Sequence, residues 1–217
     1  MIWDWFRKSF ERKSKEETTM TELLKAAKLS SDFVHHHHHK GSRPFWISYF
    51  KTITHREVIH RDILPYLKDE TFHSLEELKK EIPVDGILIM KDVDEIQNKL
   101  YQGYVMIQFH EKDKKCLLIQ ATERVSRQVG ISEVEFSVLG PKASFVEDLN
   151  TNMNLMRQRF PLPQLTFNEL LVGKLSKTRV VVAYIDGIAS EENVNTMMQR
   201  LHDLEFDDVI DTSILQQ

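Results

Sequence analysis

Asp186 is the side chain in this 217-residue sequence best placed to carry out catalysis. It follows Lys177–Ile185, an apolar run typical of a strand, and it precedes a segment with a helical pattern. Open α/β sheets bind ligands at the carboxyl ends of their strands, so a carboxylate here could hold a metal ion or a substrate amine. The alternative is a turn in which Gly187 supplies a positive φ. We favour the turn.

A polar stripe on a predicted helix is the second candidate. Asn150, Asn154 and Arg157 recur at i, i+4 and i+7, so they share one helix face. Amide and guanidinium groups suit recognition of a polar small molecule or of a neighbouring subunit. A solvated outer face has the same pattern, and we favour that interpretation. Four basic residues add positive charge nearby: Lys142, Lys174, Lys177 and Arg179. This charge would suit an anionic ligand, or it would only keep the surface soluble.

Five consecutive histidines, His35–His39, form the third candidate. A purification tag would explain them, but the tract is internal and runs into a strand-like segment. On a strand, His35, His37 and His39 would face one side and the other two the opposite side. Because no acidic or cysteine ligand accompanies the tract, we expect no functional metal site.

The rest of the sequence argues against an enzyme. Seven glycines leave little for a phosphate-binding loop, and no nucleotide-binding, hydrolase or zinc-protease motif occurs. The single cysteine, Cys116, lies in an apolar run and is expected to be buried and inert. A net charge of -4, from 29 basic and 33 acidic residues, disfavours nucleic acid as a partner. We therefore expect no catalytic residue, no cofactor and no nucleic-acid binding.

The elements that would position these residues are predicted from apolar periodicity and capping signals. Residues 1–30 have few core-forming patterns and are expected to be a tail. Trp3, Phe6 and Phe10, interleaved with basic residues, would suit either a solvated segment or an amphipathic helix on an anionic membrane. No apolar run approaches the roughly 20 residues that cross a bilayer, so we expect a soluble, cytoplasmic chain.

Strands and short helices are predicted over residues 31–125. Thr54 with Glu57 predicts a capping box that opens a helix to about Leu67, which Pro65 would kink or end. Ser74 with Glu77 predicts a second such helix to about Glu81. A third helix is predicted at Val93–Leu100, and Gly103 would cap it. The remaining predicted elements are strands at Arg43–Lys51, Tyr104–Phe109 and Cys116–Gln120, and the last two form a hairpin.

A second block is predicted over residues 130–217. Ser144 with Glu147 predicts a capped helix to about Phe160. Its apolar stripe would be Phe145, Leu149, Met153, Met156 and Phe160. Val134–Val138 and Leu165–Val172 should be strands, Lys177–Ile185 a buried central strand, and Ser190 should cap a helix to about Leu204. The fold class predicted is α/β, with two small subdomains, 31–125 and 130–217, each a sheet with flanking helices, joined by a short linker in Thr122–Gly130.

Three segments of this second block resemble the GerA family, the A subunits of bacterial spore germinant receptors. Residues 135–152 resemble its G-P-x-x-x-F-x-E signature through Gly140, Pro141, Phe145 and Glu147. Residues 154–159 resemble its N-L-x-R-x-R motif, and residues 176–189 resemble its T-R-V-x-x-x-Y-x-x-G-I-A pattern. Ser31-Asp32-Phe33 and Pro44–Lys51 resemble the early strands of the family more weakly.

The resemblance implies the soluble N-terminal domain of a receptor subunit that takes part in nutrient-triggered spore germination. It implies a membrane domain C-terminal to this fragment, B and C subunits and other A subunits as partners, and a spore inner-membrane location with this domain on the cytoplasmic side. Two roles stay open: coupling and assembly within the receptor complex, which we favour slightly, or binding an amino acid or sugar between the two subdomains. The ligand or subunit contacts would then come from Lys142, Asn150, Asn154, Arg157, Arg179 and Asp186.

Overall fold

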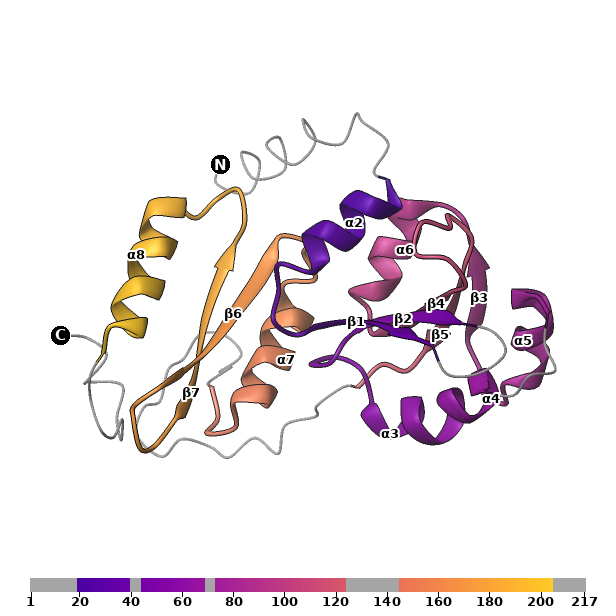
Figure 1. The fold of residues 1–217 in the computed structure, drawn as a ribbon, viewed down its shortest axis with the longest axis horizontal. Coiled ribbons are helices and arrows are strands. Elements are labelled where there is room, and N and C mark those ends of the chain that lie inside the picture. The colour runs from indigo at the N-terminus through magenta and orange to yellow at the C-terminus, as the bar shows by residue number, and fades with distance from the viewer. Residues whose placement is uncertain (1–18, 40–43, 69–72, 124–144, 205–217) are drawn as a thin grey trace, which may run out of the picture.

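The structure, a computed structural model, describes residues 19–39, 44–68, 73–123 and 145–204 (Figure 1). It contains a five-stranded sheet with the order β1-β2-β4-β5-β3 and a two-stranded sheet of β6 and β7. Helices cover both sheets, so the α/β class is confirmed. Every pairing within the two sheets is antiparallel. We call residues 19–123 the first unit and residues 145–204 the second unit.

The first unit is built on the five-stranded sheet. The β4–β5 hairpin forms as predicted, with Met106 opposite Leu118. The prediction omitted β3, a strand too short to show a clear period. The strands are β1 (Phe33–His38), β2 (Phe45–Phe50), β3 (Ile87–Met90), β4 (Tyr104–Gln108) and β5 (Cys116–Gln120).

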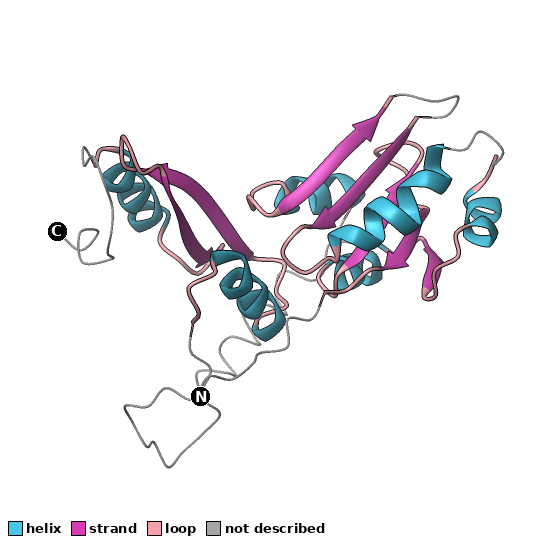
Figure 2. Ribbon diagram, turned by 90° about the horizontal axis from the view of Figure 1, so that it is seen from below, coloured by secondary structure: helices cyan, strands magenta, loops and turns pink. Residues whose placement is uncertain are grey.

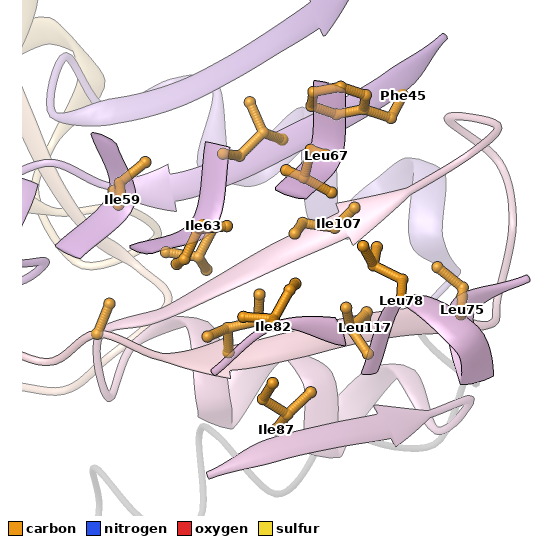
Figure 3. Close-up of a cluster of buried hydrophobic side chains, with 14 residues drawn as sticks. Phe45, Ile59, Ile63, Leu67, Leu75, Leu78, Ile82, Ile87, Ile107 and Leu117 are labelled. Atoms are coloured by element: carbon orange, nitrogen blue, oxygen red, sulfur yellow. The ribbon is translucent and has the colours of Figure 1, made fainter. Parts of the chain in front are cut away.

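Alternation along the strands divides the first unit into two apolar layers. Ile107 and Leu117 point into the layer that Figure 3 shows, under the helical segment of residues 56–68 and helix α5 (Leu75–Glu81). Met106 and Leu118 point to the other face, where α2 (Met20–Ala27) and α6 (Val93–Leu100) cover them. Each layer holds 14 buried residues, so the first unit has a complete core on both faces of its sheet.

Helix α2 corrects the expectation of an N-terminal tail over residues 1–30. Thr19 and Glu22 form a capping box, in which each side chain accepts a hydrogen bond from the other residue's backbone N–H. Met20, Leu23, Leu24 and Ala27 are buried in the layer with α6. Eight residues are too few to give a strong periodic signal, and burial against the sheet stabilises the helix.

The segment of residues 56–68 corrects the capping box predicted at Thr54 and Glu57. The N-cap is His55, which makes no side-chain capping bond, and Thr54 instead forms a β-bridge with Thr122. The helix passes through Pro65 without ending. It consists of α3 (Arg56–Val58), a π-helical turn η1 (Ile59–Ile63) and α4 (Leu64–Lys68). The π-helical turn lies just before the proline, whose missing N–H cannot continue the ordinary helical bonding.

The second unit is a β-hairpin between two helices (Figure 2). Strands β6 (Leu165–Val172) and β7 (Thr178–Ile185) pair along their full length. Helix α7 (Leu149–Arg159) covers one face, and α8 (Glu191–His202) covers the other. The prediction of a buried central strand at 177–185 is wrong, because β7 pairs only with β6 among the described residues and no position in it is fully buried.

Helix α7 differs from its prediction at both its start and its buried face. It begins at Leu149, where Asp148 accepts a hydrogen bond from Thr151 N at 2.6 Å, rather than at Ser144. Phe145 and Phe160, the ends of the predicted apolar stripe, are 70% and 40% exposed. The face that is buried carries Met153 together with Asn154 and Arg157. The prediction of a solvated polar stripe is therefore wrong for its two C-terminal members.

Several predictions fall outside the described residues and stay predictions. These are the aromatic segment before residue 19, the strand Val134–Val138, the cap Ser144 and most of the linker Thr122–Gly130. The subdomain boundaries at 125 and 130 fall there too.

Candidate functional site at the junction of the two units

Arg157 and Asp32 form a buried ion pair between the two units. Arg157 projects from α7, and Asp32 stands immediately before β1. The pair is bidentate, with Arg157 Nε 2.8 Å from Asp32 Oδ2 and Arg157 Nη2 2.7 Å from Asp32 Oδ1. Both residues are at most 1% exposed. Such a pair fixes α7 in one position relative to the start of β1, because separating the partners leaves an uncompensated buried charge.

The remaining acceptor positions of Asp32 and two more N–H groups of Arg157 are also engaged. Ser30 Oγ and Thr52 Oγ1 each donate to the Asp32 carboxylate at 2.6 Å. Arg157 Nη2 donates to Ser30 Oγ at 2.9 Å, and Nη1 donates to the Leu165 carbonyl at 3.0 Å. The Asp32 carboxylate thus accepts four hydrogen bonds, its full capacity. We call Ser30, Asp32, Thr52 and Arg157 the junction cluster.

Aromatic rings enclose the guanidinium of the junction cluster. The Arg157 Cζ atom lies 4.3 Å from the ring centre of Phe50 and 4.8 Å from that of Phe167. Tyr101 adds a third ring at 5.6 Å, and burial raises the pKa of its phenol to about 12. Phe50 and Tyr101 belong to the first unit and Phe167 to the second. Cation–π contacts therefore join the units around the same charge.

Further hydrogen bonds between the two units involve backbone groups, one of them with backbone on both sides. Ser31 N donates to the Phe167 carbonyl at 2.7 Å, and Phe167 N donates to Ser30 Oγ at 3.0 Å. Asn154 Nδ2 donates to the Thr52 carbonyl at 2.6 Å. Tyr101 Oη donates to the Pro163 carbonyl at 3.0 Å. The outer edge of β6 is thus bonded to the first unit at Phe167.

A cavity of about 460 Å³ lies beside the junction cluster. Arg157 and Gln158 line it from the second unit, and Tyr101 and Tyr104 line it from the first. Gln158 Nε2 donates to Asn154 Oδ1 at 2.5 Å. The other lining residues are Ile53, Gln102, Gln120, Thr122, Glu123 and Pro161. Its mixed wall of amides, hydroxyls and rings suits a small polar molecule.

The structure divides the six predicted contact residues among different places. Asn154 and Arg157 meet in the junction. Asn150 and Arg179 form a separate, exposed group, in which Arg179 Nε lies 2.6 Å from Glu169 Oε1 and Arg179 Nη2 lies 3.3 Å from Asn150 Oδ1. The Arg179 guanidinium lowers the pKa of the Glu169 carboxyl.

Asp186 and Lys142 do not join either group. Asp186 is exposed in the turn after β7, where its backbone N–H bonds to the Gln164 carbonyl at 2.8 Å. Because β6 and β7 are antiparallel, the argument from carboxyl ends of parallel strands does not apply to it. Lys142 lies outside the described residues.

Sequence reasoning missed the first-unit half of the junction cluster. Ser30, Asp32 and Thr52 stand at the ends of their elements, where short polar residues usually signal turns. One signal was available: Asp32 lies between Ser31 and the first residue of β1, in a segment that already showed family resemblance. A lone carboxylate does not name its partner 125 positions away.

Four of the five histidines, His35–His38, lie in β1, where side chains alternate as predicted for a strand. His35 and His37 both stack on Trp46, each with ring centres 4.4 Å apart. His35 also contacts Ser48 Oγ and Glu111 Oε1, at 2.8 Å and 3.0 Å. Burial is the largest cause that lowers the pKa of His35. Among the residues that the structure describes, no three His, Cys, Asp or Glu side chains are grouped to hold a metal ion.

Two other predictions concern the core and the membrane. Cys116 is fully buried in β5, and burial raises the pKa of its thiol to about 12, as expected of an inert cysteine. Within the described ranges, no helix has both the length and the apolar character needed to span a bilayer.

Comparison with known proteins places this architecture in a family. A family model described as Bacillus/Clostridium GerA spore germination protein matches residues 19–217. The chain belongs to this GerA family. The chain is 36% identical over 200 residues to spore germination protein GerIA of Bacillus cereus, with 92% of this chain and 30% of that protein covered. GerQA of the same organism is 32% identical over 199 residues, with 92% and 40% covered. The chain therefore spans less than half the length of these GerA relatives.

A solved structure shows the same fold. The N-terminal domain of the A subunit of the Bacillus megaterium spore germinant receptor GerK3 matches with a TM-score of 0.65 and 20% identity. The match covers 92% of this chain and 78% of that one. The predicted GerA resemblance is thus confirmed, and the fold is that of a known germinant-receptor domain.

Proposed function

We propose that this chain is the N-terminal domain of a germinant-receptor A subunit and that it couples and assembles the receptor during nutrient-triggered germination. Its family membership and its fold support this assignment. In this proposal a membrane domain follows the fragment, B and C subunits and other A subunits bind it, and it works on the cytoplasmic side of the spore inner membrane.

The observation that carries the coupling role is the buried Arg157–Asp32 ion pair. A domain that transmits force must move as one body, and a ligand clamp must open along its cleft. Here the two units are joined by a bidentate ion pair, three surrounding rings, one backbone–backbone hydrogen bond and several hydrogen bonds between a side chain and a backbone group. Opening the junction would separate Arg157 from Asp32, which is costly for a buried ion pair. A rigid connection between the two units is therefore favoured over a hinge.

The test is made in the complete receptor with Asp32→Asn. Asparagine keeps the volume but removes the charge that Arg157 needs, so nutrient germination should fall while receptor protein remains. Because Asp32→Asn also lowers the stability of the domain, the control is Leu78→Ala, which is destabilising too. Leu78 is fully buried and lies in the first unit, away from the junction cluster. Germination that falls equally in both variants would reduce the junction cluster to a core support. Arg179→Ala should leave germination near its normal level.

The second candidate function is binding of an amino acid or sugar between the units. The cavity beside Tyr101, Tyr104 and Gln158 supports it. An NMR titration of the chain with amino acids, sugars and nucleosides separates the two candidates. Saturable shifts confined to the cavity residues would make this domain a nutrient sensor. A silent spectrum of the folded chain would favour coupling alone.

A further inference from the structure

The turn that joins β6 and β7 carries the most exposed large apolar side chain of the described residues. Leu175 is 79% exposed, and Leu171 beside the turn is 62% exposed. Val172, between them in sequence, is 2% exposed and packs against Leu201 of α8. The exposed leucines are thus held on a hairpin whose inner side is anchored. We call residues 171–179 the hairpin tip.

The hairpin tip is also positively charged. Lys174, Lys177 and Arg179 lie in it, and the sequence holds no acidic residue from 170 to 185. The whole chain, in contrast, has a net charge of -4. Glu169, just before this stretch in the sequence, pairs with Arg179 and lies 3.7 Å from Lys51 Nζ of the first unit. The tip therefore presents basic groups around exposed leucines on an otherwise acidic protein.

The backbone of the tip is held in a defined turn. Gly173 has a φ of +91° and Lys177 a φ of +44°, both in the left-handed region. A lysine in that region is uncommon, and it directs the chain sharply back into β7. Two more exposed apolar residues, Phe145 and Val146, stand just before α7, whose Asn150 contacts Arg179. Asn152 fixes Val146 through both its backbone N–H and its carbonyl.

We propose that the hairpin tip docks on an anionic lipid bilayer, with Leu175 inserted among the headgroups and the lysines bound to the lipid phosphates. Apolar side chains flanked by basic ones are attracted to such surfaces by burial and by the negative surface potential together. The lysine stems can lie along the apolar region while their ammonium groups stay at the phosphates. A turn with exposed leucines can insert into a bilayer without the broad contact area that a stable protein partner needs. This surface is separate from the junction cluster, so its test is independent of the coupling role.

The test uses Leu175→Cys in the full 217-residue chain, labelled with an environment-sensitive fluorophore. Cys116 is fully buried with a raised thiol pKa, so the label goes to the introduced cysteine. With vesicles containing phosphatidylglycerol, the label at 175 should shift to shorter wavelength and saturate. With vesicles of phosphatidylcholine alone, the affinity measured from this shift should be weaker by about tenfold or more. The position control is Leu29→Cys, an equally labelled, 54% exposed leucine of the first unit, which should not shift.

Charge reversal completes the test. Lys174→Glu with Lys177→Glu should weaken the binding seen at position 175 by about tenfold or more. The matched reversal, Lys79→Glu with Lys80→Glu, lies on α5 in the first unit and should leave it unchanged. Equal weakening by both reversals, or equal shifts at positions 29 and 175, would overturn the proposal. So would a shift at 175 that depends on protein concentration without vesicles, which would assign the tip to a second copy of the chain.

Discussion

The two units of this domain are stabilised in different ways. The first unit buries 14 hydrophobic residues on each face of a five-stranded sheet. The second unit buries three hydrophobic residues between its hairpin and α7, and two between the hairpin and α8. An isolated two-stranded hairpin is marginal in water. The described part of the second unit therefore depends on the first for its stability, and the junction cluster is where it is attached.

This difference explains where polar and apolar residues lie in the second unit. Arg157 and Asn154 occupy the buried face of α7, whereas Leu171 and Leu175 are exposed on the hairpin. An attachment through hydrogen bonds and one ion pair is directional, so it sets the orientation of the hairpin as well as its position. The first unit therefore fixes the orientation of the second unit.

Asp32→Ala should give the largest effect of the single changes considered. Arg157 would keep its charge in a buried site without a partner, so we expect a loss of about 3–5 kcal/mol. Amide hydrogen exchange should show β6 and β7 losing protection before β4 and β5. The double variant Asp32→Ala, Arg157→Met should recover part of the loss in urea denaturation. A loss below about 1 kcal/mol, or equal loss of protection in both sheets, would contradict the dependence of the second unit on the first.

Gly103→Ala should come next, and Gly187→Ala is its counterpart in the second unit. Both glycines have positive φ, +86° and +77°. A Cβ at Gly103 would lie 2.5 Å from the Ile53 carbonyl oxygen, whereas a Cβ at Gly187 would meet nothing within 4 Å. We expect about 1–2 kcal/mol at Gly187 from φ alone, and clearly more at Gly103. Urea denaturation of both variants decides this, and equal losses would contradict the close approach at Gly103.

Alkaline pH should weaken the first unit through Cys116. Burial raises the pKa of this thiol from 9 to about 12 in the folded state. The unfolded chain therefore loses its proton first, so this contribution is intact below pH 9 and is lost as pH rises from 9 to about 12. The slope is about 1.4 kcal/mol per pH unit, which Cys116→Ala should flatten in urea denaturation at pH 8, 9 and 10. An unchanged slope in that variant would assign the alkaline loss to other groups.

Arg179→Ala should give the smallest effect. Its ion pair with Glu169 is on the surface, with the arginine side chain 41% exposed. Exposed pairs contribute less than about 1 kcal/mol, and salt screens them. Denaturation at low and high salt should therefore show a small loss that disappears at high salt. A loss comparable with that of Asp32→Ala would mean that the two groups of charges on the second unit do not differ.

Much of the fold could be predicted from local signals in the sequence. The strands Arg43–Lys51, Tyr104–Phe109 and Leu165–Val172 were each located within about two residues, because alternation and turn residues mark them. The helix Val93–Leu100 was predicted with its bounds, and burial of Cys116 followed from its apolar neighbours. These features depend on neighbours a few positions away, which one sequence displays.

Other features depend on contacts that are distant in sequence, and only the tertiary structure decided them. The apolar run of β7 predicts a central strand, yet β7 pairs with a single described strand, β6. The residues of one strand do not specify which other strands will pair with it. The polar stripe of α7 reads as a solvated face, yet Arg157 is buried because Asp32, 125 residues earlier, supplies the opposite charge. The sequence by itself determined the residue types that could form the junction; the three-dimensional fold decided which of them meet, because a buried charge is stable only where a partner is brought to it.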